Sequence, residues 1–220
     1  MRNVSVLVAI GVGLDGHRAI LGVAEGAKEG RSGWAEFLKH LKERGLTGVK
    51  LIISDACVGL VDSLAEHYPQ ACWQRCAMHF YRNVLSQVPR AKMRAVATMV
   101  KVIHAADDRS AALTASRVVE KLKEMKLPKA ASLIERAVPD TLAYYAFPDT
   151  HWRSLRTNNP MERLMREIRR RTRVVGAFPD GQSALMLVAA RLRHIATTHW
   201  GTRRYLAMEA AAVKEVVASI

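Results

Sequence analysis

The sequence lacks any long apolar run. The run nearest the start, Val4–Val12, is only nine residues long and is soon followed by Asp15, whereas a membrane-spanning helix needs about 18 apolar residues or more. Cysteine is also scarce. Cys57, Cys72 and Cys76 are odd in number and lie close together in the chain, which argues against a disulfide framework and fits a reducing compartment. These absences exclude a membrane span and predict a soluble protein of the cytoplasm.

Acidic residues are few relative to basic ones. The 220 residues include 34 Lys and Arg against 20 Asp and Glu, which gives a formal net charge of +14. Half of the residues are hydrophobic, enough for one sizeable core or for a core with a smaller companion, so a disordered chain is excluded. Because a positive surplus of this size attracts polyanions, nucleic acid is the leading partner. The alternative is that the basic residues are spread over the surface for solubility.

The first 80 residues predict alternating strands and helices. Apolar residues alternate on either side of the turn at 11–16, which predicts a β-hairpin with Val4, Val6, Val8 and Ile10 on one face. The rest of this segment predicts, in order, an amphipathic helix between Ser32 and Gly45, a buried strand at 49–53, a helix at 56–67 and a short strand at 71–73. This order predicts an α/β fold with a mixed sheet, of which residues 1–80 form the first part.

The pattern changes to helices alone at 81–150. Lys and Arg are interleaved there with Val, Met, Ala and Leu, and prolines punctuate the pattern at Pro89, Pro128, Pro139 and Pro148. We interpret this segment as an all-helical insertion. Residues 151–220 predict helices that complete the core: two helices separated by a turn at 176–181, and an alanine-rich helix at 205–217.

Asp55 is the first candidate site residue. It follows an apolar strand and precedes a helix, which places its carboxylate at the carboxyl edge of the sheet, where open α/β sheets bind ligands. The alternative is a structural role, because Ser54 and Asp55 are both suitable residue types for the N-cap of the following helix.

Glu162 is the second candidate. Asn159 followed by Pro160 predicts a helix start. One face of this helix must pack on the sheet, and it carries Met161, Leu164, Met165, Ile168 and Thr172. Beside that face, Glu162 heads a row with Arg166, Arg169 and Arg173. A carboxylate there can hold a metal ion while the guanidinium groups hold phosphates; the alternative for Glu162 is a capping-box contact with Asn159.

The basic residues are concentrated rather than spread. Between Arg153 and Arg173 the chain has eight Arg, no Lys and two Glu, so +6 of the total charge lies in this short segment. Arginine suits bidentate phosphate contact, whereas a face built for solubility mixes Arg and Lys. The distribution favours binding to the backbone of DNA or RNA.

Cys76 and His79 form a Cys-x-x-His pair. Such a pair supplies at most half of a tetrahedral zinc site, and no second pair with suitable spacing follows. A zinc-braced module with Cys72 is therefore a minor alternative. A Cys–His nucleophile is weaker still, because nothing in the sequence identifies an oxyanion hole.

Four motifs in a fixed order connect these candidates. They are SDACVGL at 54–60, WQRCAMHFYRN at 73–83, TNNPMER at 157–163 and RTRVVGAFP at 171–179. Together they closely resemble the Mutator-type transposases of bacterial insertion sequences. The resemblance extends from about Val4 to Trp200 and includes the helical stretch, which resembles the insertion that splits the catalytic core in that family.

The resemblance implies a ribonuclease H-like fold, in which two Asp and one Glu gather two Mg²⁺ or Mn²⁺ ions for phosphodiester cleavage and strand transfer. Asp55 matches the second acid and Glu162 the third, whereas Cys76 and His79 match an element that braces the site. The implied partners are DNA, as element ends and target, and further copies of transposase; the location is then the nucleoid within the cytoplasm. The residues expected to contact DNA are Arg156, Arg163, Arg166, Arg169, Arg170 and Arg173.

One departure from the family pattern concerns the first Asp. The resemblance implies that this acid lies on a strand upstream of Met1, and Asp15 does not replace it because Gly13–Gly16 matches a hairpin turn. We therefore expect an N-terminally truncated catalytic part that is inactive alone. The alternative function is a non-catalytic DNA-binding remnant that acts as a decoy.

Overall fold

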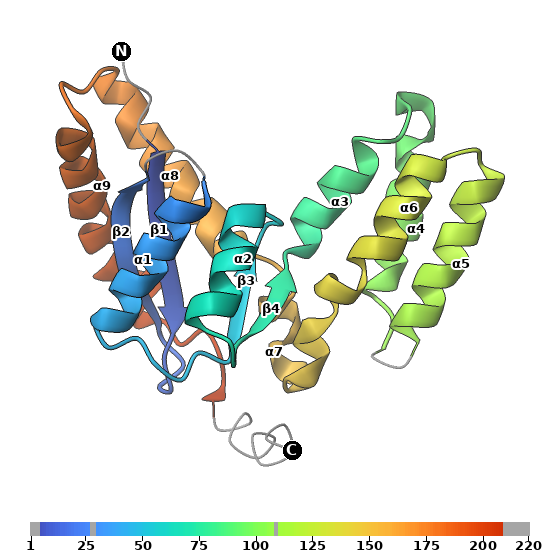
Figure 1. Cartoon of the computed structure of the whole chain (residues 1–220), viewed down its shortest axis with the longest axis horizontal. Helices are drawn as coiled ribbons and strands as arrows, with labels where there is room; N and C mark the ends of the chain where they lie inside the picture. Colours follow the sequence, from blue (N-terminus) through green and yellow to red (C-terminus); the bar gives the residue numbers. More distant parts are fainter. Residues whose placement is uncertain (1–4, 27–29, 108–109, 209–220) are drawn as a thin grey trace. The chain divides into compact units, whose positions relative to one another are not determined.

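The computed structural model describes residues 5–26, 30–107 and 110–208 (Figure 1). The strands are β1 (Ser5–Val12), β2 (Arg18–Gly26), β3 (Leu51–Ser54) and β4 (Cys72–Arg75). The α-helices are α1 (Arg31–Glu43), α2 (Val58–His67), α3 (Ala77–Leu85), α4 (Arg90–Ile103), α5 (Ala111–Glu124), α6 (Pro128–Ala137), α7 (Asp149–Leu155), α8 (Asn159–Val175), α9 (Gly181–Ala196) and α10 (His199–Thr202). Two 3-10 helices, η1 (Pro139–Thr141) and η2 (Ala143–Ala146), lie between α6 and α7. Across the described ranges, no helix combines the length and apolar character needed to cross a bilayer.

The described residues form two compact units. Unit 1 holds those within 5–50, 57–71 and 159–208, and unit 2 holds those within 51–56 and 72–158. Unit 1 therefore contains β1, β2, α1, α2 and α8–α10, whereas β3 and β4 belong with α3–α7 in unit 2.

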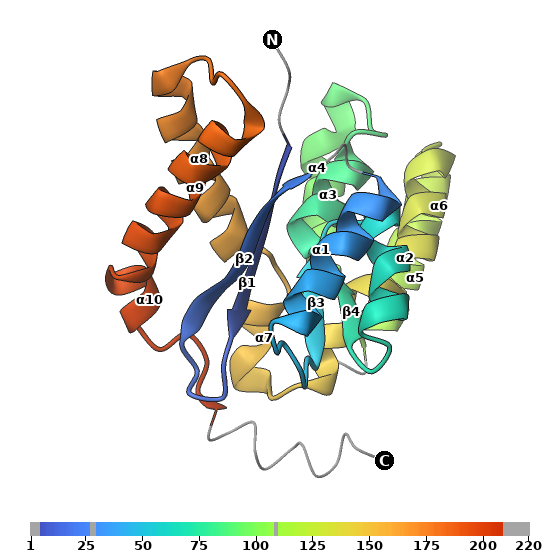
Figure 2. The same cartoon turned by 60° about the vertical axis from the view of Figure 1, so that its left-hand side comes forward.

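Unit 1 is built around the antiparallel hairpin of β1 and β2. Val8 pairs with Val23, and the register shifts between Ala9 and Ile10. Figure 2 shows α8 and α9 on one face of this hairpin and α1 on the other. The α8–α9 face packs Leu164, Ile168, Val188, Leu192 and Ile195 against Val6, Val8, Ile10, Ile20 and Val23. The alternating apolar residues of β1 thus supply one wall of the core, as their spacing predicts.

The opposite face of the hairpin requires a close approach to α1. A side chain at Gly22 would place its Cβ 2.7 Å from the Leu41 Cδ2 atom, so glycine lets α1 rest on β2. Phe37 and Leu41 of α1 are buried there. On the far side of α1, Ser63 of α2 donates its hydroxyl to the backbone carbonyl of Arg31, at 3.3 Å.

Unit 2 contains a short parallel pair, β3 and β4, in which Ser54 is opposite Arg75. Gln74 of β4 is fully buried. Its amide donates to the Thr141 carbonyl (2.8 Å) and accepts from the Tyr144 N–H (2.9 Å), so β4 is fastened to both 3-10 helices. Because a buried amide is costly to leave unpaired, these bonds specify how the strand and this segment pack.

The helices α3–α6 enclose a separate apolar core in unit 2. Its fully buried members include Phe80, Val84, Val96, Ile103, Leu122 and Ile134. Pro128 opens α6, and α4 begins directly after Pro89, because proline fits the first turn of a helix but not its interior.

Most of the predicted elements are confirmed. The hairpin, the helix before Gly45, the strands near 51 and 72, and the two helices around the turn at 176–181 are all present. The α/β class is confirmed, but the four strands form one antiparallel and one parallel pair, in separate two-stranded sheets. Tyr205 to Ala207 are not helical, and the predictions for Val4 and for 209–217 fall outside the described residues.

Candidate active site and nucleic-acid interface

Asp55 directly follows β3 and is exposed. Its alternative role as a helix cap is wrong, because α2 has Cys57 as its N-cap residue and no side chain caps the helix. Ser54 does not cap it either. Its hydroxyl donates to the Asp55 carbonyl (2.8 Å) and accepts from the indole N–H of Trp73 (2.9 Å). The Asp55 carboxylate therefore stands at the carboxyl end of a parallel pair, the position where α/β folds bind ligands.

Arg75 interacts electrostatically with both Asp55 and Asp140. Burial lowers the pKa of the Arg75 guanidinium, while the negative charges of Asp140 and Asp55 act in the opposite direction. Burial likewise raises the pKa of Asp140, and Arg75 opposes that rise. The end of the β3–β4 pair thus holds two carboxyl groups within electrostatic reach of one guanidinium, all in unit 2.

Cys76 connects the two chain segments that flank this region. Its backbone N–H donates to the Ser54 carbonyl, at 2.7 Å. Its fully buried sulfur accepts a hydrogen bond from the backbone N–H of Asn158, at 3.2 Å. The next residue, Ala77, donates its N–H to the Arg156 carbonyl, at 2.9 Å. One cysteine therefore fastens the end of β3 to the segment that leads into α8.

These contacts bear on the alternatives for the Cys-x-x-His pair. The Cys76 sulfur is buried and engaged by a backbone N–H, an arrangement that favours bracing over nucleophilic attack. His79 is half-buried in the first turn of α3, whereas Cys72 is exposed. Within 5–26, 30–107 and 110–208, no three His, Cys, Asp or Glu side chains group so as to hold a metal ion. Cys72, Cys76 and His79 therefore do not come together as a zinc site requires.

Helix α8 has the two faces that its sequence predicts. Leu164 and Ile168 are buried in the core of unit 1, with Met161 and Met165 partly buried beside them. The opposite face carries exposed guanidinium groups, those of Arg163, Arg166, Arg169, Arg170, Arg171 and Arg173. Glu162 is half-buried in the first turn. It belongs to unit 1, whereas Asp55 belongs to unit 2.

Glu167 divides the arginines of α8 into paired and unpaired groups. Its carboxylate accepts two hydrogen bonds of 3.0 Å from Arg170 and lies 3.5 Å from Arg171; Arg191 of α9 also donates to it. The Arg170 hydrogen bonds, followed by that of Arg191, lower the pKa of Glu167 to about 2. Among the ion pairs of the described residues, none involves Arg163, Arg166, Arg169 or Arg173.

None of the four sequence motifs indicates this role of Glu167. Arg170 and Arg171 are three and four positions further along the same helix, which is a spacing that supports ion pairs. That spacing is the signal that could have separated the paired arginines from the unpaired ones. Arg191 lies on a different helix, and no local pattern indicates its contact.

Arg156 has a structural contact inside unit 2. It is half-buried, and its guanidinium donates to the backbone carbonyl of His104, at 3.1 Å. His104 in turn bridges the Tyr81 hydroxyl and the Thr141 hydroxyl, each at 2.9 Å. Burial, and next the charge of Arg156, lower the pKa of His104 to about 4. Arg156 thus positions His104 through its backbone carbonyl, and its charge helps to keep the buried imidazole neutral.

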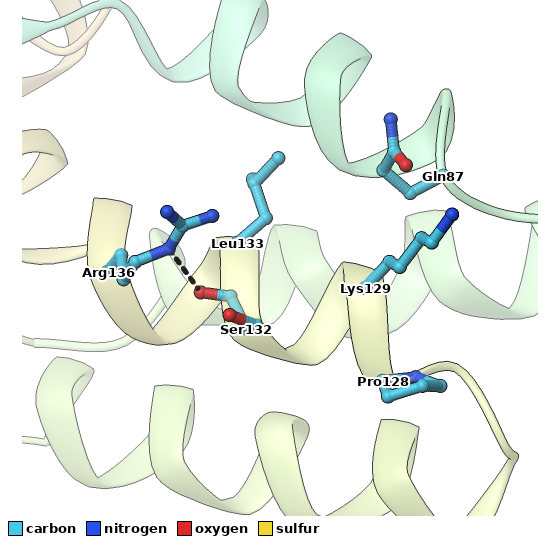
Figure 3. Close-up of a pocket in the computed structure, with 6 residues that line it drawn as sticks. All are labelled: Gln87, Pro128, Lys129, Ser132, Leu133 and Arg136. Carbon is cyan, nitrogen blue, oxygen red and sulfur yellow. Dashed lines mark hydrogen bonds between the residues drawn. The ribbon is translucent and has the colours of Figure 1, made fainter.

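A shallow cavity of about 520 Å³ lies in unit 2 (Figure 3). Its lining residues are Gln87, Pro128, Lys129, Ser132, Leu133 and Arg136. The Arg136 guanidinium donates to the Ser132 carbonyl at 3.3 Å, and none of the predicted site residues lines the cavity. It is therefore not the candidate active site.

Comparisons with known proteins agree with the order of motifs. Residues 1–201 match the model of a family described as "Transposase, Mutator family". A transposase for insertion sequence element IS1081 from Mycobacterium tuberculosis is 41% identical over 208 residues, which cover 94% of this chain and 50% of the relative. A transposase for element ISRM5 from Rhizobium meliloti is 37% identical and covers 93% of this chain and 52% of the relative.

A more distant relative is the transposase for element IS256 in transposon Tn4001 from Staphylococcus aureus. It is 34% identical over 187 residues, which cover 84% of this chain and 48% of the relative. The chain thus spans about half the length of these curated relatives.

Proposed function

Because the chain belongs to the Mutator family of transposases, we propose that it is a catalytic part of an insertion-sequence transposase. Its substrates in this proposal are DNA strands, both the ends of the element and the target. The reaction is phosphodiester cleavage followed by strand transfer, on a ribonuclease H-like core formed by 1–80 and 151–220 and interrupted by a helical insertion at 81–150. The protein then acts on the nucleoid and associates with further copies of transposase.

The observation that carries the proposal is the bracing by Cys76. This residue holds Ser54, the neighbour of Asp55, and Asn158, which precedes Glu162 by four positions. The two segments that carry the predicted acids are separated by about a hundred residues in the chain, yet one side chain and its backbone engage both. This supports Asp55 and Glu162 as partners in one site.

Asp55 and Glu162 are the residues that would hold Mg²⁺ or Mn²⁺, because carboxylate oxygens are the ligands these ions prefer. An exposed carboxylate at a strand end and a half-buried one in a helix's first turn fit that role. When bound, such ions activate the attacking water or 3′-hydroxyl and stabilise the leaving oxygen. In this proposal the first Asp of the family completes the ligand set.

The arginines of α8 bind and orient the DNA in this proposal. Arg163, Arg166, Arg169 and Arg173 are exposed and unpaired among the described ion pairs, and a guanidinium group can contact a phosphate through two parallel hydrogen bonds. Arg170 must break its hydrogen bonds to Glu167 before it can contact a phosphate. The Arg156 guanidinium is already engaged by the His104 carbonyl. We therefore assign the stronger DNA contacts to the four unpaired groups.

The test uses a transposase of full family length that contains these 220 residues. It is assayed with Mn²⁺ for strand cleavage and joining on DNA that carries element ends. Asp55→Asn and Glu162→Gln each remove a ligand oxygen's charge and should abolish both steps. Matched controls are Asp62→Asn and Glu135→Gln, which change exposed acids elsewhere and should leave activity intact. Full activity of both active-site variants would refute the assignment.

A second candidate function is a non-catalytic DNA-binding decoy. It is favoured by the exposed row of unpaired arginines, which needs no metal site to bind DNA. If this function is correct, the 220-residue chain inhibits an intact transposase while cleaving nothing, and its own DNA affinity falls steeply between low and moderate salt. An affinity that hardly changes with salt would contradict it.

A further inference from the structure

Arg18 occupies an unusual position at the start of β2. Its guanidinium carbon lies 4.7 Å from the ring centre of Trp200 and 5.0 Å from that of Tyr205. Both distances are within the range of cation–π attraction. The Nε atom is buried and has no hydrogen-bond partner, so the polar contacts of this side chain depend on its two terminal nitrogens.

A backbone clamp holds the aromatic partner in place. Gly16, in the hairpin turn, accepts hydrogen bonds from the N–H groups of Tyr205 (2.7 Å) and Leu206 (3.2 Å). It has a φ of +78°, and a Cβ there would lie 2.1 Å from the Leu206 carbonyl oxygen. Only glycine permits both features. The segment after α10 is therefore fixed against the turn, beside Arg18.

Two more arginines belong to segments that pack near the start of β2 in unit 1. Arg204 forms a bridge with His17, which brings Arg203 close to Arg18. Met161 of α8 packs in the same apolar cluster as Ile20 and Trp200. Arg163 directly follows the first turn of α8, and Arg203 is the residue after α10; both are exposed. Burial lowers the pKa of the Arg18 guanidinium, the interaction with Tyr205 opposes this, and repulsion from Arg203 and Arg163 adds to the lowering. None of the three takes part in an ion pair of the described residues. Asp15, the acid nearest in sequence, is turned to His17.

We propose that Arg18, Arg163 and Arg203 together bind one phosphodiester group of the DNA backbone. Three guanidinium groups that form no ion pair repel one another, and a phosphate offsets that repulsion by accepting several charge-assisted hydrogen bonds. Trp200 and Tyr205 orient the Arg18 guanidinium before the ligand arrives, which reduces the entropy lost on binding.

The inference rests on the proposed function and extends it. It adds Arg18 and Arg203 to the DNA-binding residues, neither of which the arginine-rich segment contains. Because Arg163 directly follows Glu162 in the chain, the bound phosphate lies close to the proposed third acid. The cluster therefore fixes the DNA strand at a point beside that acid rather than along the far end of α8.

The experiment measures the affinity of the 220-residue chain for a fluorescent DNA duplex by anisotropy, over a series of salt concentrations. Arg203→Gln and Arg18→Gln should each weaken binding by about tenfold. Each should also reduce the slope of log affinity against log salt concentration by up to about one. Because all three groups share one phosphate, the double variant should lose less than the product of the two single losses. The matched control is Arg117→Gln, an exposed arginine of α5 in unit 2, which should bind as the unchanged chain does.

The outcomes separate this inference from the proposed function. If the chain binds DNA but Arg18→Gln and Arg203→Gln behave like Arg117→Gln, the cluster is not a phosphate site and the proposed function stands. If the unchanged chain binds no DNA even at low salt, both fail. Arg203 is exposed, so its variant keeps the test valid if Arg18→Gln does not fold.

A separate arm distinguishes DNA from free phosphate. Thermal unfolding of the chain is followed with and without inorganic phosphate. The phosphate concentration is one at which the chain still binds the DNA duplex in the anisotropy assay. We expect no stabilisation that depends on Arg203. A phosphate-induced rise in melting temperature that Arg203→Gln abolishes, together with unchanged DNA affinity of that variant, would overturn the assignment to DNA.

Discussion

Arg156 and Arg163 are seven positions apart, yet they serve the two units in different ways. In unit 2, Arg156 is half-buried and donates to the His104 carbonyl, within a network that also engages Tyr81 and Thr141. In unit 1, Arg163 is exposed and joins no ion pair of the described residues. Arg156 of unit 2 is used to hold its own structure, whereas Arg163 of unit 1 is left available for a ligand. The same residue type therefore supports opposite expectations for stability and for DNA binding.

The largest expected effect is the acid sensitivity of unit 2. Burial, and next the charge of Arg156, lower the pKa of His104 from 6.5 to about 4. The neutral imidazole therefore contributes stability that is fully present above about pH 6.5 and is lost as the pH falls to about 4. The loss is on the order of 3 kcal/mol. Urea unfolding at pH 7 and pH 4.5 measures it.

His104→Gln should flatten this pH dependence, because the variant has no imidazole to protonate. The matched control is His40→Gln, which changes an exposed histidine of α1 and should keep the dependence of the unchanged chain. Equal pH dependence in His104→Gln and the unchanged chain would show that another group is responsible.

A pair of arginine substitutions tests the comparison itself. Arg156→Gln leaves the His104 carbonyl without its charged donor and should lower the free energy of unfolding by about 1–3 kcal/mol. Arg166→Gln removes an exposed charge and should change it by less than about 0.5 kcal/mol, while weakening DNA binding several-fold. Urea unfolding and anisotropy with a DNA duplex measure the two effects. If Arg166→Gln lowered the free energy of unfolding and Arg156→Gln weakened only DNA binding, the distinction between the two units would be wrong.

The smallest expected effect concerns Glu167. Hydrogen bonds, first from Arg170 and then from Arg191, lower its pKa from 4.5 to about 2. Its contribution to stability is therefore present above about pH 4.5 and is lost as the pH falls toward 2. Glu167→Gln should remove that modest contribution and release arginines, so that DNA affinity rises several-fold. Glu135→Gln removes the same charge from α6 and should not reproduce the rise; if it does, only net charge matters.

Local patterns in the sequence predicted most of the secondary structure. Alternation in β1 places Val6, Val8 and Ile10 on one face, and the spacing along α8 identifies Leu164 and Ile168 as buried. Such patterns are short-range, since a strand repeats every two residues and a helix about every 3.6.

Contacts between distant residues could not be predicted in this way. The hydrogen bond from Arg156 to His104 joins residues 52 positions apart, and that from Asn158 to Cys76 joins residues 82 positions apart. No periodicity relates such pairs. Arg18 shows the same limit, because its partners Trp200 and Tyr205 come from the other end of the chain. Asp55 and Glu162 remain predictions from the motifs, supported by the bracing of Cys76.

The most direct test of the account is whether Asp55 and Glu162 are neighbours. Each is replaced by cysteine in a chain whose Cys57 and Cys72 are serine, and the protein is treated with a short reagent that joins two thiols. A shared active site predicts rapid intramolecular cross-linking between the two cysteines. The cross-linked protein migrates faster on a denaturing gel, and the reaction needs no Mn²⁺. The reference pair, Asp55→Cys with Glu135→Cys, should not cross-link. Absence of cross-linking between positions 55 and 162, in a protein that unfolds like the unchanged chain, would contradict the shared active site.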